Sequence, residues 1–329
     1  MNTAPINTAE AVVEVLTASS AQDLFGTDRP ARRYRELARA LHPDLAAGAD
    51  ATAAFIRLAR LWQDRHGTVI RTRIGEYRLT DRSFQGDLAD LFEAGEGEFL
   101  KLPRNPVNND LMEREASALR TMADLGDPRF LPYVPRLVES FLHRDATTGA
   151  DRRVNVIGTV PGLRSLAEVG AAYPGGVDPR DVAWMWRRLL VAIGFAHRAG
   201  LVHGAVLPPH VLIEPGEHGL VLVDWCYSAM SGERIPALVP DFTDRYPAEV
   251  HKRQSPGPGT DIFMATRCMT DLMGPKAPGP LRSFAAGCAL SSLDARPDDA
   301  WRLLDELDGV LARLYGPRRF RPFRLDPVS

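Results

Sequence analysis

Two short stretches decide the fold of this chain: residues 203–213 read HGAVLPPHVLI, and residues 220–226 read LVLVDWC. The apolar segments 211–213 and 220–223 are separated by a turn that contains glycine, and this pattern predicts a short pair of strands. Polar side chains flank the pair, with His203 and His210 before it and Asp224 after it. These side chains are the first candidates for functional groups.

The composition is that of an ordinary globular protein. Of the 329 residues, 45% are hydrophobic and 25% are charged, which argues against disorder, collagen and coiled coils. The net charge of −2 favours neither nucleic acid nor an anionic membrane as a partner. The three cysteines are too few and too scattered for a disulfide framework, and no apolar run reaches the ~18 residues of a membrane helix. We therefore expect a cytoplasmic protein with no nucleic-acid partner and no membrane span.

Residues 1–66 are expected to form an all-helical module. Thr8 can cap a first helix, and Asp28, with Pro30 in the first turn, can begin another. An apolar stripe at helical spacing runs from Tyr34 to Leu41, and a similar stripe runs from Phe55 to Trp62. Because the connection between them is short, the two stripes must face each other to be buried. The sequence therefore predicts a helical hairpin.

From about residue 67 the pattern becomes strand-like, and beyond residue 162 it is mainly helical. A helix is predicted over about residues 109–122, another from Asp178 to Gly200, and a third that ends at Gly316. The tail, residues 317–329, carries four arginines and one aspartate. Five strands are predicted before the helical part, at residues 77–80, 88–92, 99–102, 136–143 and 153–159.

The helical hairpin resembles a J-domain of the DnaJ family. Residues 34–44 read YRELARALHPD, and with Ala54-Phe55 they match that family's helix–HPD–helix pattern over about residues 20–66. The resemblance implies that residues 30–50 bind a DnaK-type chaperone, using Arg35, Arg39, His42, Pro43 and Asp44. The simpler interpretation is that His-Pro-Asp only ends a helix. The module also departs from the family, because it uses arginine where the family's helix is rich in lysine.

The rest of the chain, residues 67–316, resembles the protein-kinase fold. That resemblance implies an α+β, bilobal body with a five-stranded N-lobe at about 74–160 and a helical C-lobe at about 161–316. Residues 99–102 (FLKL) match the strand that carries the nucleotide lysine, Lys101, and Glu115 matches the helix glutamate that pairs with it. Glu113 is the neighbouring alternative. Lys101 is one of only three lysines among 40 basic residues, which favours a specific point-charge role.

Three further matches concern the catalytic and supporting segments. Residues 203–213 align with the catalytic loop, and residues 222–226 align with the metal-binding D-F-G, so the resemblance makes Asp224 a metal ligand. Residues 246–249 (YPAE) resemble the A-P-E segment, and Asp261 resembles the start of the large C-lobe helix. Arg296 fits the arginine that pairs with the A-P-E glutamate, which predicts a buried ion pair between Glu249 and Arg296.

The departures from the kinase pattern carry the functional argument. Ala205 stands where the family has the proton-accepting aspartate, and His210 stands where it has the asparagine that binds a second Mg²⁺. Gly204 replaces the catalytic-loop arginine. The turn at residues 83–87 has one glycine, Gly86, where the family uses three, and it places Asp87 near the expected phosphates. ATP and Mg²⁺ remain possible cofactors through Gly86, Lys101, Glu115 and Asp224.

Three hypotheses follow. The first is a J-domain pseudokinase, a co-chaperone or adaptor that recruits a DnaK-type chaperone and binds an unidentified client or a nucleotide. The second is an active, atypical ATP-dependent phosphotransferase that uses Lys101 and Asp224. The third is a scaffold that binds neither nucleotide nor chaperone. The retained charges can also be only a structural ion-pair network, in which case His203 and Trp225 are packing residues and the tail arginines are a solvated or docking segment.

Overall fold

A computed structural model of the chain describes residues 6–26, 29–42, 45–46, 48–66, 69–79, 83–95, 97–145, 149–230 and 232–325. The chain divides into two compact units. The first comprises residues 1–84 and 92–96, and the second comprises residues 85–91 and 97–329. This division passes through two strands, and each unit is described separately below.

The first unit begins with four helices, α1 (Thr8–Thr17), α2 (Ala21–Phe25), α3 (Pro30–Ala40) and α4 (Ala49–His66). The prediction that Thr8 caps α1 was wrong by one residue, because Asn7 is the cap. The Asn7 side chain accepts from the Glu10 amide, and the Glu10 carboxylate accepts from the Asn7 amide, so each residue satisfies a free helix-end group. Helix α3 begins at Pro30 as expected, whereas the predicted cap Asp28 lies outside the described residues.

The predicted apolar stripes do pack together. Leu37 and Leu41 of α3 and Leu58 of α4 are fully buried in one cluster. The rings of Tyr34 and Trp62 stack with their centroids 4.3 Å apart, which joins the two helices along the same face. The helical hairpin expected from the spacing of apolar residues is therefore present.

Strands β1 (Val69–Arg71) and β2 (Glu76–Arg78) follow the helices and pair with each other in a two-stranded sheet. The strand predicted at residues 77–80 therefore exists in part, but it does not belong to the five-stranded sheet. That sheet has the order β3-β4-β5-β7-β6, so its first strand is β3 (Ser83–Gln85). The remaining strands are β4 (Ala89–Gly95), β5 (Glu98–Pro103), β6 (Arg136–Arg144) and β7 (Asp151–Gly158).

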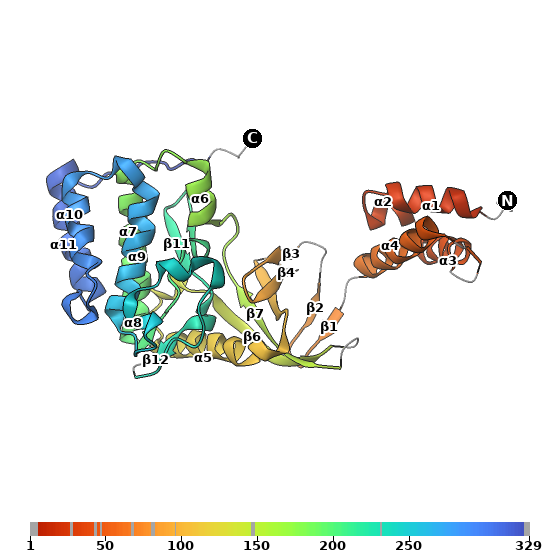
Figure 1. Cartoon of the computed structure of the whole chain (residues 1–329), viewed down its shortest axis with the longest axis horizontal. Coiled ribbons are helices and arrows are strands. Elements are labelled where there is room, and N and C mark those ends of the chain that lie inside the picture. Colours follow the sequence, from red (N-terminus) through yellow and green to blue (C-terminus); the bar gives the residue numbers. More distant parts are fainter. Residues whose placement is uncertain are drawn as a thin grey trace. The chain divides into compact units, whose positions relative to one another are not determined.

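In the second unit the antiparallel register of β5 and β7 positions the key lysine, because it sets Lys101 opposite Asn155. Helix α5 (Asn109–Leu125) packs against β6 and β7 through a buried face that includes Met112 and Leu119 (Figure 1). The helix prediction for residues 109–122 is thus confirmed and extends by three residues at the carboxyl end.

The helical part is built around α7 (Pro179–Arg198), which contacts α9 (Pro258–Met273) and α11 (Ala300–Tyr315), as seen in Figure 1. Asp178 caps α7 by accepting from the Arg180 amide, and the chain leaves the helix at Gly200 with φ +72°, as the sequence predicts. The other helices are α6 (Leu166–Ala172), α8 (Ala248–His251) and α10 (Gly279–Cys288). Across the part of the chain that the structure describes, no helix has the length and hydropathy to cross a bilayer.

Short strands and turns carry the functional loops. The predicted strand pair is present as β10 (Val211–Glu214) and β11 (Gly219–Leu222), which pair antiparallel with Val211 opposite Leu222. The smaller strands are β8 (Arg164–Ser165), which pairs with β10, and β9 (Leu201–Val202), which pairs with β12 (Ala229–Met230). Single 3₁₀ turns connect several of these elements, at residues 106–108, 131–133, 208–210, 225–227, 240–245, 274–276 and 293–295.

A buried ion pair supports the helical part. Arg296 donates to both carboxylate oxygens of Glu249, over 2.6 and 3.1 Å, and the hydroxyl of Thr260 donates to the same carboxylate. The guanidinium also lies 4.6 Å from the centre of the Phe263 ring. The pair expected from the sequence is therefore formed, and it joins α8, α9 and the segment before α11.

We expect Arg296→Met to lower the free energy of unfolding by ~3–5 kcal/mol, because it leaves the Glu249 carboxylate buried without its counter-charge. Urea denaturation measures this loss. The matched control is Arg302→Met, since Arg302 pairs with Glu306 on the exposed face of α11, where we expect a change of ~0.5 kcal/mol or less. Equal losses in the two variants would contradict a structural role for the buried pair.

Candidate functional site

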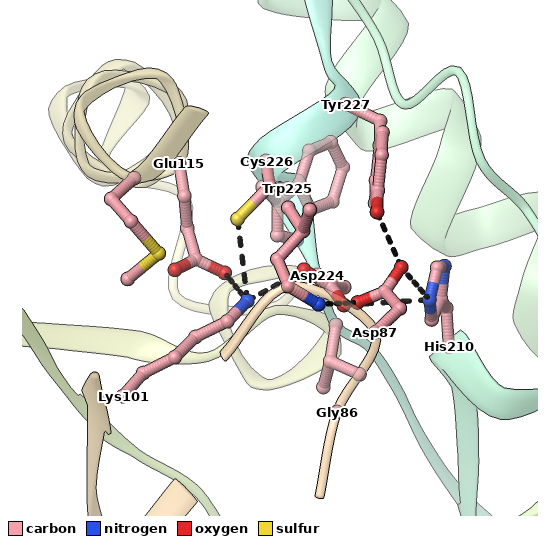
Figure 2. Close-up of polar contacts among 12 residues, drawn as sticks. Gly86, Asp87, Lys101, Glu115, His210, Asp224, Trp225, Cys226 and Tyr227 are labelled. Atoms are coloured by element: carbon pink, nitrogen blue, oxygen red, sulfur yellow. Dashed lines mark hydrogen bonds and ion pairs between the residues drawn. The ribbon is translucent and has the colours of Figure 1, made fainter. Parts of the chain in front are cut away.

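Strand β5 places the ammonium group of Lys101 in the interior of the second unit, where the residue is 3% exposed. Its Nζ donates to Glu115 Oε1 over 2.9 Å and to Asp224 Oδ1 over 2.5 Å, and it lies 3.3 Å from Cys226 Sγ. Figure 2 shows Lys101 directed at these three side chains. Burial alone would lower the pKa of Lys101, but the charge of Asp224, with that of Glu115, holds this pKa well above its usual value. Lys101 is therefore a charged, fully paired ammonium.

Helix α5 supplies the partner glutamate from its buried face. Glu115 is 1% exposed, and its second oxygen accepts from Asn155 Nδ2 over 2.9 Å. Glu113, the alternative considered above, lies on a different face, where its carboxylate is 3.0 Å from Arg153. The structure therefore brings Glu115, and not Glu113, to Lys101.

Asp224 occupies the loop that follows β11, and its backbone has φ +68°, a left-handed conformation that aspartate tolerates better than most residues. Burial would raise the pKa of this carboxyl group, but Lys101 and then His210 lower it below its usual value, so the group is a carboxylate. Trp225, next in the chain, is fully buried and donates to the Leu222 carbonyl, which makes it a packing residue. Burial raises the pKa of the Cys226 thiol, so it is not a thiolate nucleophile.

The loop at residues 203–205 is held by its backbone. The Asp261 carboxylate accepts from the amides of His203 and Gly204, over 2.7 and 2.9 Å, and is fully buried. Gly204 has φ +74°, and a Cβ there would lie 2.7 Å from the Tyr227 carbonyl, so glycine is required at this position. The close Tyr227 carbonyl therefore explains why residue 204 is glycine, where the resembled family has arginine.

His203 is locked in one neutral form. Its Nε2 donates to the Val223 carbonyl over 2.9 Å, because a carbonyl can only accept, and its Nδ1 accepts from the Ala205 amide over 3.2 Å. Burial lowers the pKa of His203 to about 4, although the charge of Asp261 opposes the shift. His203 is therefore a packed, hydrogen-bonded histidine.

Ala205 is fully buried beside these groups, so its methyl group stands where the resembled loop has a carboxylate. Its carbonyl accepts from His210 Nδ1 over 2.8 Å. A methyl group can neither accept a proton nor orient a substrate hydroxyl. Residue 205 therefore supplies no general base.

Sequence reasoning missed the contacts on the other side of His210. Its Nε2 lies 3.6 Å from Asp87 Oδ2 and 3.4 Å from Asp224 Oδ2, and the Tyr227 hydroxyl donates to Asp87 over 2.5 Å. Figure 2 shows Asp87 between Tyr227 and His210. The only sequence signals were an acidic residue after Gly86 and a histidine in place of asparagine, and neither reveals that the two approach each other.

Gly86 begins the turn that delivers Asp87. Its amide donates to the Ala89 carbonyl over 2.9 Å, and a Cβ at this position would lie 2.9 Å from the same oxygen. The Gly86 carbonyl in turn accepts from Arg104 over 2.7 Å. Gly86 is therefore the glycine of a tight turn between β3 and β4.

These residues fit a phosphate-bearing cofactor only in part. Lys101, held by Glu115, can neutralise a phosphate, and Asp224 can ligate one metal ion. His210 is a poor match for Mg²⁺, which prefers oxygen ligands, and the Asp87 carboxylate would repel phosphate. The donor set does not fit the two-magnesium arrangement of the resembled catalytic loop.

The predicted chaperone-binding segment lies in the first unit. Arg35 and Arg39 are exposed one turn apart on α3, and the ring of His42 lies 5.9 Å from that of Phe55 in an edge-to-face arrangement. Pro43 and Asp44 lie outside the described residues.

Comparison with solved structures identifies a protein-kinase-like fold over about three quarters of the chain. The chain resembles the structure of vaccinia related kinase 3, at 18% identity over 76% of this chain and 91% of that one, with a TM-score of 0.58. It also resembles the PknI kinase domain of Mycobacterium tuberculosis, at 14% identity over 71% of this chain and 95% of that one, with a TM-score of 0.54. The predicted protein-kinase-like fold, α+β with a sheet and a helical lobe, is thus confirmed. Identities this low establish the fold alone.

Sequence comparison adds little. No family model matches the chain. A segment of 45 residues is 38% identical to casein kinase II subunit alpha' of Saccharomyces cerevisiae, but it spans 14% of this chain and 13% of that protein. The activity of that relative therefore does not transfer to this chain, and the J-domain resemblance stays a prediction.

We expect the protonation of His203 to destabilise the protein in weak acid. The folded-state pKa of about 4 lies below the ordinary value of 6.5, so the unfolded chain takes up a proton that the folded chain does not. The free energy of unfolding should fall by ~3 kcal/mol from this group as the pH drops from about 6.5 to 4, with no further loss below. Urea denaturation across this pH range measures the slope. In His203→Gln the extra slope should disappear, and an identical slope in both proteins would contradict the assignment.

Proposed function

We propose that this chain is a cytoplasmic J-domain co-chaperone or adaptor whose kinase-like body binds a partner and has lost efficient phosphoryl transfer. The observation that carries the proposal is Ala205, a buried methyl group at the position where the resembled loop has its proton acceptor. The helical module would recruit a DnaK-type chaperone through residues 30–50. The body would hold a client protein or a nucleotide.

The loss of phosphoryl transfer follows from the groups that line the loop. Removing a positioned general base costs ~10²–10⁴-fold in rate. His210 in place of an oxygen ligand removes further stabilisation of the developing charge. The retained Lys101, Glu115 and Asp224 are then a charge network that holds the body together.

The recruitment of a chaperone is supported by the charges of the first unit. Arg35 and Arg39 present two guanidinium groups on the exposed side of α3, and His42 follows at the end of that helix. Exposed guanidinium groups on a rigid helix can dock an acidic surface of a partner. The buried cluster of Leu37, Leu41 and Leu58 keeps that helix fixed.

The second candidate function is an ATP-dependent phosphotransferase. It is favoured by one observation, the buried ion pair of Lys101 with Glu115, at 2.9 Å, which is the pair that holds nucleotide phosphates in the resembled fold. Bound Mg-ATP would supply the phosphoryl group, while Lys101 would bind phosphate and Asp224 the metal. This function needs a proton acceptor that Ala205 does not provide.

The co-chaperone proposal predicts that the intact protein accelerates ATP hydrolysis by a DnaK-type chaperone. His42→Gln should abolish the acceleration, and the double variant Arg35→Ala/Arg39→Ala should weaken binding by about tenfold or more, as expected for central interface residues. The matched control is His251→Gln, which changes an exposed histidine of α8 in the other unit and should keep full activity. Rates at the chaperone-only baseline for the wild-type protein would overturn the proposal and leave the scaffold hypothesis.

The pseudokinase assignment predicts that restoring the missing groups restores chemistry. With labelled ATP, the double variant Ala205→Asp/His210→Asn should transfer phosphate about 100-fold faster than the wild-type protein, since a positioned base contributes on this order. Adding Asp224→Ala should remove the gain. Transfer by the wild-type protein that Asp224→Ala abolishes would instead establish the phosphotransferase.

A further inference from the structure

A cavity of about 760 Å³ lies in the helical part of the second unit, between α7, α11 and the tail that follows α11. We call it the basic groove and define it by Arg180 and Arg187 of α7, Leu311 of α11 and residues 317–321 of the tail. Its volume is within the range of ligand-binding cavities in proteins. None of its lining residues belongs to the site around Lys101, so the basic groove is a separate feature.

The tail that forms one wall of the basic groove is fixed at three points. The ring of Phe320 lies 4.5 Å from the ring of His218, and the guanidinium of Arg321 lies 3.4 Å from the Asp178 carboxylate. Further along, Phe323 is buried in the main apolar cluster of this unit. The tail therefore runs from the end of α11 past the start of α7 and is packed against the body (Figure 1). Its arginines are held in place as part of the groove.

Positive charge dominates the basic groove. Among its described lining residues the one carboxylate is Asp308, which pairs with Arg187. In the part of the chain that the structure describes, Arg180, Arg318 and Arg319 form no ion pair with a carboxylate. Burial, and then the charges of nearby guanidinium groups, lower the pKa of Arg187, which shows how closely like charges gather here. A guanidinium group can only donate hydrogen bonds, so this lining favours an acceptor-rich anion.

The spacing of the charges favours an extended anion. Arg180 and Arg187 are two turns apart on α7, about 10 Å along the helix axis at ~1.5 Å per residue. An extended peptide, which rises ~3.3 Å per residue, can place acidic side chains over this distance within about three residues, whereas a single phosphate cannot span it. The groove also has an apolar part at Leu311 and at Phe320, whose ring is 63% exposed. An apolar side chain of the same peptide can pack there.

We propose that the basic groove binds an extended acidic segment of a partner protein that also carries an apolar side chain. The carboxylates of this segment pair with Arg180, Arg318 and Arg319, as guanidinium groups and carboxylates do in proteins. Its apolar side chain packs against Leu311 and Phe320. This inference rests on the proposed function, because it names the surface by which the kinase-like body holds a partner. Its test contains no chaperone and measures no ATP hydrolysis, so failure of the groove and failure of the co-chaperone activity are distinguishable.

Fluorescence anisotropy of a labelled peptide with the full-length protein tests the groove. The probe is a short run of glutamates around a central leucine, and its counterpart has glutamine in place of each glutamate. We expect the acidic peptide to bind, more weakly as salt is added, and the glutamine peptide not to bind. Arg318→Gln/Arg319→Gln should weaken binding by about tenfold or more. The matched control Arg313→Gln/Arg324→Gln removes two exposed arginines of α11 and the tail that do not line the groove, and it should bind like the wild-type protein.

A variant with the opposite effect guards against damage to the fold. Asp308→Asn removes the carboxylate that pairs with Arg187 and should tighten binding of the acidic peptide by about threefold or more, which an unfolded protein could not do. Thermal melting without peptide should show each variant folded. The proposal is overturned by equal binding of the glutamine peptide, by full binding in Arg318→Gln/Arg319→Gln, or by no binding of the acidic peptide. If inorganic pyrophosphate binds in that last case, the groove is a phosphate site instead.

Discussion

The buried ammonium of Lys101 is the constraint on which the rest of the body depends. Burying the Lys101 ammonium at 3% exposure without a counter-charge would cost much folding free energy. Other elements must therefore bring carboxylates to it. Strand β5 supplies the lysine, helix α5 supplies Glu115, and the loop after β11 supplies Asp224. The sheet and the helical part of the second unit are therefore held in one arrangement by charge as well as by apolar packing. This network is complete without any nucleotide.

The loop at residues 203–210 is held by contacts that do not involve the side chain of residue 205. Asp261 holds two of its amides, Gly204 provides the backbone conformation that the Tyr227 carbonyl requires, and His210 holds the Ala205 carbonyl. None of these contacts uses the side chain of residue 205. The determinants of loop shape and of proton transfer are thus physically separate. The shape of this loop therefore does not depend on the side chain at residue 205.

The parts that the sequence predicts correctly are those set by local signals. The start and end of α7 follow from Asp178, Pro179 and Gly200, and the strand pair around residues 211–222 follows from two apolar runs separated by a turn that contains glycine. The pair of Glu249 and Arg296 was accessible only through resemblance to a known fold. The wrong prediction concerns which of two adjacent residues caps a helix, since Asn7 and not Thr8 caps α1. The missing predictions concern contacts between segments that are distant in the sequence. No local pattern indicates that Asp87 meets His210, because the two approach only after the sheet and the helical part have formed.

The position of Asp87 bears directly on whether the residues around Lys101 can do chemistry. A carboxylate is present near the catalytic loop after all, but it comes from the turn after β3 and not from residue 205. Its Oδ2 already accepts from the Tyr227 hydroxyl and faces His210, so its lone pairs are engaged in holding two loops together. A carboxylate at residue 205 in addition would place three acids around one imidazole, with only Lys101 to offset them. Asp87 is therefore a contact between the turn after β3 and the loop at residues 203–210, and it does not replace a proton acceptor at residue 205.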